Sequence, residues 1–156
     1  MKTGMLLLNT RCIRGFTIVE LLVVLAMGGI LVGAAVPSLL AYVQSKNLDG
    51  AARVIWGDLQ SARMEAIKTN QSVTVQFAST TLYSFSFVDG VGVTHTFWRN
   101  LGQDYPGVTV ALDAGNTLTF RSTGSGQPGV TRTVTVTGPS GALSFQVSWT
   151  GRIQNL

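Results

Sequence analysis

The sequence predicts an α+β fold in which one long N-terminal helix, membrane-spanning in its first half, packs on an antiparallel β-sheet domain. Three observations predict it. Residues 16–43 are almost uniformly apolar, residues 44–70 carry apolar side chains at helical spacing, and residues 71–156 consist of short alternating segments separated by turns. Short strands without helices between them favour antiparallel pairing over parallel β–α–β units.

Most of the basic surplus lies ahead of the apolar segment. The formal net charge is +4, and Lys2, Arg11 and Arg14 precede Gly15 with no acid among them. Removing these three from the 11 basic residues leaves 8, against 7 acidic residues. The charge balance of the remainder therefore gives no indication of nucleic-acid binding. Cys12, the only cysteine, lies in the same N-terminal stretch, so a chain without that stretch forms no disulfide.

The segment from Phe16 to Val43 has the length and polarity of a membrane span, with a single charged residue, Glu20. A helix crosses a bilayer with about 20 apolar residues, and the preceding positive charge predicts a cytoplasmic N-terminus. A secretory signal peptide fits less well, because the run is too long and the residues AAV at 34–36 form a weak cleavage site. An ordinary anchor explains the length but not the carboxylate, which costs on the order of 3 kcal/mol within a membrane.

The stretch GFTIVELLVVLAMGGILVGAAVP, residues 15–37, resembles the N-terminal signature of type IV pilins and type II secretion pseudopilins. In that family a prepilin peptidase cuts after the glycine and the new N-terminal residue is N-methylated. The resemblance implies cleavage between Gly15 and Phe16, N-methylation of Phe16 and a helix kink at Pro37.

Cleavage at this point gives Glu20 a physical role. It creates an ammonium group at Phe16, and a buried carboxylate is tolerated when it is paired. The resemblance implies that Glu20 of one subunit meets the N-terminal amine of a neighbour, which fixes the register of otherwise apolar helices. Its own N-terminus is an alternative partner, because a carboxylate in the first turn interacts favourably with the helix dipole. Both partners remain open, and neither role is catalytic.

Residues 44–70 are predicted to continue the helix and to bury one face of it. The apolar positions are Leu48, Ala52, Ile55, Leu59, Ala62 and Ala66. Their spacing of three and four residues is typical of a helix packed against a sheet. Trp56 and Met64 are expected to widen the buried face, and Asp49 and Arg53 are placed for an i,i+4 ion pair.

Strand signals dominate from Gln71 onward. The predicted strands are SVTVQF (72–77), LYSFSFV (82–88), the weaker THTFWRN (94–100), GVTVAL (107–112), TLTF (117–120), VTRTVTVTG (130–138) and ALSFQVSWTG (142–151). The last two flank a turn at 138–141 and form the clearest hairpin. The stretch STGSGQPG at 122–129 is predicted to be a mobile surface loop.

The helix and first strand, together with the C-terminal WTGRIQNL, resemble more narrowly the GspH/FimT branch of the pseudopilins. Members of that branch carry a two-sheet β domain and a C-terminal Gly-Arg segment.

No pattern in the sequence indicates an enzyme, a metal site or a cofactor site. His95 is the only histidine, so a metal site would depend on scattered carboxylates. Asp89, Asp104 and Asp113 all lie beside turn residues, and turn chemistry explains them. We expect no cofactor.

DNA binding is the alternative function. Some FimT-like minor pilins are DNA receptors for natural transformation and use a C-terminal GRxR motif. The corresponding residues here are GRIQ at 151–154, so glutamine replaces the second arginine. Arg121, Arg132 and Arg152 are nevertheless unaccompanied by acids over residues 114–156, and arginines bind phosphates or stack on bases.

The sequence therefore predicts a minor pseudopilin of a type II secretion pseudopilus or a type IV pilus tip. It is expected in the bacterial inner membrane, with its C-terminal domain in the periplasm, and then in a periplasmic or surface filament. The expected partners are other pilin or pseudopilin subunits, prepilin peptidase, the inner-membrane assembly platform and membrane lipid, with DNA in the alternative. The expected segments are a leader at 1–15 beginning at Met1 or Met5, a transmembrane or filament-core helix at 16–43, its amphipathic continuation at 44–70, and a periplasmic β domain at 71–156.

Overall fold

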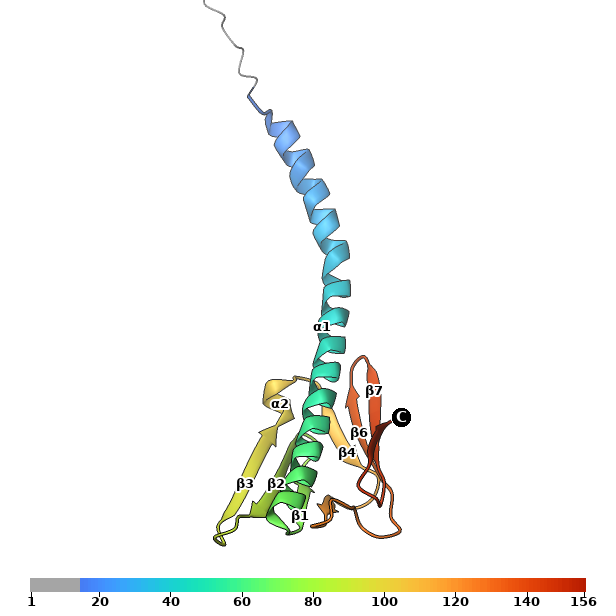
Figure 1. Cartoon of the computed structure of the whole chain (residues 1–156). Coiled ribbons are helices and arrows are strands. Elements are labelled where there is room, and N and C mark those ends of the chain that lie inside the picture. Colours follow the sequence, from blue (N-terminus) through green and yellow to red (C-terminus); the bar gives the residue numbers. More distant parts are fainter. Residues whose placement is uncertain (1–14) are drawn as a thin grey trace, which may run out of the picture. The chain divides into compact units, whose positions relative to one another are not determined.

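The computed structural model describes residues 15–156 (Figure 1). Most of the predicted leader, including Cys12 and both candidate start residues, lies outside the described residues. The chain divides after Ser38 into two compact units, the second of which runs from Leu39 to Leu156. One helix, α1 (Ile18–Thr69), continues through the boundary.

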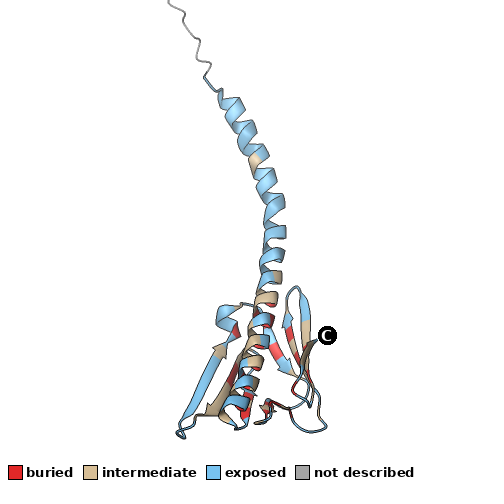
Figure 2. Ribbon diagram, viewed as in Figure 1, coloured by how far each residue is buried: buried red, intermediate tan, exposed pale blue. Residues whose placement is uncertain are grey.

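The first half of α1 exposes its apolar side chains on every side, as the pale blue colouring in Figure 2 shows. Among the described residues, α1 is the one helix that is long and apolar enough to cross a membrane. A Cβ added at Gly28, Gly29 or Gly33 would meet no other atom within 4 Å. This part of α1 therefore has no core of its own within the chain.

The second half of α1 buries one face, as its apolar spacing predicts. The buried residues are Leu48, Ala51, Ala52, Ile55, Leu59, Ala62 and Ala66. The prediction for Trp56 and Met64 is wrong, because their side chains are 44% and 68% exposed. Each α-helical residue turns by about 100°, so Trp56 points away from the direction of Ile55. Asp49 and Arg53 form no ion pair, which corrects that prediction as well.

The β domain contains the predicted strands and two short elements that sequence patterns did not indicate. The strands are β1 (Val73–Phe77), β2 (Leu82–Val88), β3 (Thr94–Asn100), β4 (Thr109–Leu112), β5 (Thr117–Phe120), β6 (Arg132–Gly138), β7 (Gly141–Val147) and β8 (Ile153–Asn155). The unpredicted elements are β8 and the single-turn helix α2 (Leu101–Asp104), which Asn100 caps through its side chain. Both are too short to show a periodic pattern.

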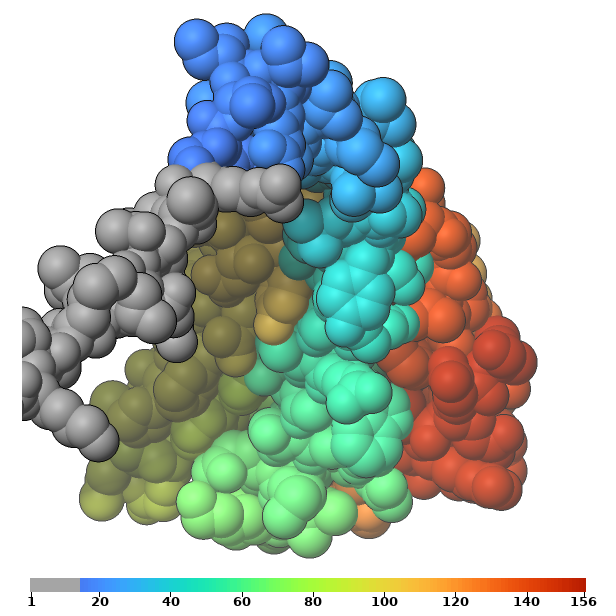
Figure 3. All heavy atoms as spheres, turned by 90° about the horizontal axis from the view of Figure 1, so that it is seen from above, coloured from blue at the N-terminus to red at the C-terminus, as the bar shows by residue number. Residues whose placement is uncertain are grey.

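The strands form two antiparallel four-stranded sheets, ordered β3-β2-β1-β5 and β4-β6-β7-β8. Gly138 pairs with Gly141, which confirms the predicted hairpin. The second half of α1 lies between the two sheets (Figures 1 and 3). It shares one core with both of them, to which Tyr83, Phe120 and Val134 contribute fully buried side chains.

The segment at 122–129 is a loop, as predicted, and residues 127–129 are exposed, but its first half is packed against the domain. Gly124 and Gly126 are buried, and the N–H of Gly126 donates to the carbonyl oxygen of Trp149 at 3.0 Å. Small residues here permit close packing, which composition does not distinguish from solvent exposure.

Candidate functional site

The N-terminal end of α1 holds the residues that the predicted maturation requires. Gly15 and Phe16 are exposed and precede the helix. Thr17 caps it, because its Oγ1 accepts a hydrogen bond from the N–H of Glu20 at 3.2 Å. Threonine followed three residues later by glutamate is the capping-box pattern. The spacing of Thr17 and Glu20 is therefore a sequence signal for the cap, which the charge of Glu20 alone does not indicate.

The carboxylate of Glu20 lies in the first turn of α1, where it interacts favourably with the helix dipole. Among residues 15–156 it has neither an ion-pair partner nor a hydrogen-bond donor. Among the described residues, its charge is therefore balanced by the helix terminus alone.

Pro37 lies inside α1, which continues on both sides of it. A proline removes one backbone donor from the helix. Nearby, Ser38 donates its hydroxyl to the carbonyl oxygen of Ala35 at 2.8 Å. The kink at Pro37 stays a prediction.

The three arginines of the DNA-binding alternative lie on different elements. Arg121 follows β5, Arg132 begins β6 and Arg152 lies in the turn before β8. Arg132 Nη1 is 3.9 Å from Asp113 Oδ1. With the Gln154 amide turned so that its oxygen faces Arg152, this oxygen accepts from Nε at 2.9 Å and from Nη1 at 3.2 Å. Gln154, in place of a second arginine, therefore binds the first one.

Gly151, the glycine of the C-terminal Gly-Arg segment, has a packing role. Its φ is +79°, and a Cβ there would overlap the carbonyl oxygen of Gly124. That oxygen also accepts a hydrogen bond from Arg63 Nε at 3.0 Å. Gly151, Gly124 and Arg63 thus connect the C-terminal segment to the end of α1, and we call them the glycine clasp.

A partly buried polar cluster, formed by Asp58, Tyr83 and Arg99, fixes α1 to the sheet that contains β2 and β3. Tyr83 Oη donates to Asp58 Oδ2 at 2.6 Å, and Arg99 donates to both carboxylate oxygens at 3.1 and 3.3 Å. Burial raises the pKa of the Tyr83 hydroxyl, and the hydrogen bond to Asp58 raises it further. The hydrogen bond to Asp58 also raises the pKa of Arg99. Sequence patterns did not indicate this cluster, because its three members are separated in the chain.

His95 lies on β3 and is bound to Asp89, with 2.9 Å between Nε2 and Oδ2. Asp89 also accepts the backbone N–H groups of Val91 and Val93. These bonds, that of His95 first, lower the pKa of the Asp89 carboxyl. The aspartate thus holds the β2–β3 turn, as turn chemistry predicts.

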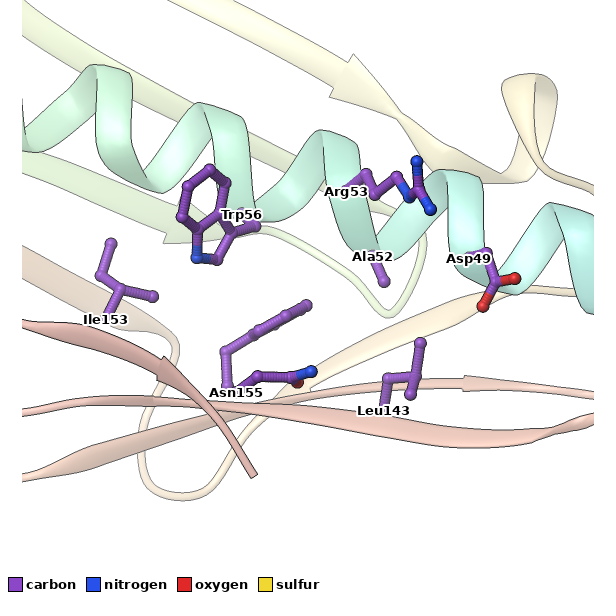
Figure 4. A pocket seen from close by; sticks show the side chains of 8 residues that line it. Asp49, Ala52, Arg53, Trp56, Leu143, Ile153 and Asn155 are labelled. Carbon is purple, nitrogen blue, oxygen red and sulfur yellow. The ribbon is translucent and has the colours of Figure 1, made fainter.

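A groove of about 610 Å³ lies between α1 and the sheet that contains β7 and β8. It is lined by Asp49, Ala52, Arg53, Trp56, Leu143, Phe145, Ile153 and Asn155. Figure 4 shows Trp56 beside α1, on the opposite side of the groove from Ile153 and Asn155 of this sheet. Trp56 therefore lines a surface groove and is not part of the core.

Two family models match the chain. The model of the type II transport protein GspH matches residues 51–151, and that of the prokaryotic N-terminal methylation motif matches residues 10–36. A search of curated proteins finds no significant match. The GspH match covers most of the second unit and all three glycine-clasp residues.

Solved structures share the fold at low sequence identity. The type IV minor pilin FimU of Pseudomonas aeruginosa PAO1 is 21% identical, with a TM-score of 0.56 over 74% of this chain and 92% of that chain. The minor pseudopilin EpsH of the Vibrio cholerae type 2 secretion system is 15% identical, with a TM-score of 0.56 over 70% of this chain and 96% of that chain. At these identities the likeness establishes the fold, which confirms the predicted pilin-like class.

The methylation motif and the apolar helix fit a protein anchored in the inner membrane. The family implies assembly with other pilin or pseudopilin subunits, which are structural proteins and not enzymes. These matches do not favour the FimT-like DNA receptor. The chain belongs to the GspH family of type II transport proteins, and its role is that of a minor pseudopilin or minor pilin.

Proposed function

We propose that the chain is the precursor of a minor subunit that a prepilin peptidase cuts between Gly15 and Phe16 and whose new N-terminal amine is methylated. The observation that carries this proposal is the position of the cut relative to α1. Gly15 and Phe16 are exposed and lie outside the helix, which begins at Ile18 after the capping residue Thr17. A peptidase needs an unwound, accessible segment, and this end of the helix supplies one.

The matured subunit is held in the inner membrane by the first half of α1, with its β domain in the periplasm. The basic residues ahead of the apolar segment support this orientation. Apolar side chains around the whole circumference of this half are suited first to lipid and then to the helices of neighbouring subunits. An assembly platform would transfer the subunit from the lipid bilayer to the filament, where the helices of neighbouring subunits surround it.

Glu20 sets the register of this assembly. Cleavage places an ammonium group at Phe16, four residues before Glu20, and an equivalent group on every neighbour. A carboxylate in an apolar bundle is stabilised by pairing and is costly without it. Apolar helices slide past one another with little energetic preference, whereas a charged pair favours one register.

Mass spectrometry of the chain isolated from its host membrane tests the maturation. The expected species begins at Phe16 and carries one added methyl group on its amine. A Gly15→Val chain serves as the control, because it alters the residue before the cut without changing α1. Recovery of wild-type protein that retains its leader, with no species beginning at Phe16, would refute the proposal.

A further inference from the structure

The exposed edge of β3 is unlike the other strand edges of the two sheets. β3 is an outermost strand and has 7 residues, whereas the other outermost strands β5, β4 and β8 have 4, 4 and 3. Proteins protect exposed edges by keeping them short, or with lysine, proline or bulges, because an open edge pairs with other chains. The β3 sequence THTFWRN has no lysine or proline. The domain therefore leaves one long edge unprotected among its described strands.

The backbone of β3 presents a row of hydrogen-bonding groups at this edge. The N–H of Leu101, just after β3, donates to the carbonyl oxygen of Thr81 at 2.7 Å, so odd-numbered positions face β2. Backbone groups alternate in direction along a strand. The N–H and C=O groups that face outward are those of Thr94, Thr96 and Trp98. An extended peptide is the partner that matches such a row.

Aromatic side chains flank the open edge on both faces of the sheet. Phe97 is 52% exposed and Trp98 on the opposite face is 62% exposed. Phe97 is held by stacking on Phe85 and Phe87, with ring centroids 5.1 and 5.9 Å apart. Figure 2 shows β3 almost entirely in the colour of exposed residues. A strand laid along β3 would cover apolar surface on both faces while it formed hydrogen bonds.

The two basic side chains of β3 are already paired with other residues of the part of the chain that the structure describes. Arg99 is bound by Asp58, and His95 is bound by Asp89. The edge thus offers no free cation to a phosphate or an acidic peptide. The complementary partner is an uncharged, extended segment with apolar side chains.

We propose that β3 is the docking edge for an extended segment of a different pilin or pseudopilin subunit, which adds to the sheet beside β3. This inference rests on the role of the chain as a subunit, because its family assembles with other such subunits. A second copy of this chain is a different occupant of the same edge, and the experiment below separates it from another subunit.

Photo-crosslinking of the full chain in its host tests the proposed partner. A p-benzoylphenylalanine residue replaces Trp98, and in a matched chain it replaces Trp149, which is 55% exposed in the turn before β8. We expect irradiation to give an adduct from position 98, identified by mass spectrometry as another pilin-like subunit. An adduct of two copies, an adduct with a protein outside this class, or an equal yield of the same adduct from position 149 would overturn the proposal.

Thr96→Pro tests whether the backbone edge makes the contact. Proline removes the outward N–H and obstructs strand addition, yet edge strands tolerate proline where this N–H faces solvent. Thr96→Ala is the control, because it keeps the N–H and removes only the side chain. We expect Thr96→Pro to lower the yield of the position-98 adduct about tenfold or more, which corresponds to a loss of about 1.4 kcal/mol in binding free energy. We expect Thr96→Ala to leave this yield unchanged.

Two further measurements keep the outcomes distinct. The mature N-terminus is measured on the same samples. An unprocessed chain counts against the proposed maturation, whereas a processed chain without the position-98 adduct counts against docking on β3. If Thr96→Pro fails to accumulate, Thr96→Lys replaces it, because an edge lysine opposes pairing without altering the backbone. Persistence of the adduct in either variant would contradict the inference.

Discussion

Gly151 lies against the backbone of Gly124, and there is no room between them for a side chain. The contact places the C-terminal Gly-Arg segment on the loop that Arg63 binds at the end of α1. The one cysteine of the sequence, Cys12, precedes the described residues, and the C-terminal segment is held here by this backbone contact and by the hydrogen bond of Arg63.

Replacing Gly151 with alanine should destabilise the domain by about 2–6 kcal/mol. A non-glycine residue at this positive φ costs about 1–3 kcal/mol, and overpacking costs about 1–3 kcal/mol more. Denaturant unfolding of the full chain in detergent measures the difference. Gly115→Ala is the control, because Gly115 has a φ of +72° but nothing within 4 Å of an added Cβ. Equal effects of the two substitutions would show that the contact with Gly124 contributes nothing.

Replacing Asp58 with asparagine should also destabilise the domain. The change leaves the hydroxyl of buried Tyr83 with a weaker acceptor and removes the charge that binds Arg99. We expect a loss of about 1–3 kcal/mol in the free energy of unfolding. Glu65→Gln is the matched control, because Glu65 is in an ion pair with the exposed Lys68, and such pairs contribute about 0–1 kcal/mol. A smaller loss for Asp58→Asn than for Glu65→Gln would contradict this account.

The burial of Tyr83 makes stability depend on pH in the alkaline range. Its pKa in the folded chain is raised above the ordinary 10.0, so the neutral hydroxyl stabilises the fold fully below pH 10. Above that pH the unfolded chain loses this proton and the folded chain keeps it. Stability then falls by up to about 1.4 kcal/mol per pH unit. Tyr83→Phe should lose less stability between pH 9 and pH 11 than the wild type. Parallel pH profiles for the two chains would refute this prediction.

Patterns of sequence predict the helix, the strand positions and the antiparallel class, because each depends on spacing along the chain. Apolar residues at intervals of three and four leave one face to bury, and Ile55 and Leu59 lie on it. Trp56 is different. Whether a side chain beside the buried face is covered depends on how far the sheet extends, and this is a tertiary property. Trp56 lines the groove between α1 and the sheet that contains β7 and β8, and so it is not covered by that sheet.

The glycine clasp and the Asp58 cluster were beyond sequence reasoning for the same reason. Asp58, Tyr83 and Arg99 have no shared motif, and only the antiparallel register places Tyr83 opposite Arg99. The capping box is the exception. Thr17 and Glu20 have the spacing of a capping box, so the cap could have been predicted from the sequence, although the prediction was not made.

Replacing Thr17 with alanine should loosen the start of α1. The change removes the side-chain acceptor of the Glu20 N–H, and losing such a cap costs about 1 kcal/mol. Amide exchange at Glu20 should become about fivefold faster in detergent micelles, as a change of this size implies. Thr17→Ser keeps the acceptor and serves as the control. Unchanged exchange in Thr17→Ala would show that Thr17 does not cap the helix.

Replacing Glu20 with alanine should leave the leader cut intact and impair assembly. The carboxylate lies within α1, beyond the unwound residues Gly15 and Phe16 where the cut is proposed, so we expect the cut not to depend on its charge. In the filament its loss leaves a neighbour's amine unpaired among apolar helices, which costs about 3–5 kcal/mol. We therefore expect the filament fraction to fall about tenfold or more, while the N-terminus at Phe16 persists in mass spectra. Glu20→Gln should behave like Glu20→Ala, because the argument depends on charge, and Leu21→Ala should assemble normally. Normal assembly of Glu20→Gln would show that shape or polarity, and not an ion pair, sets the register.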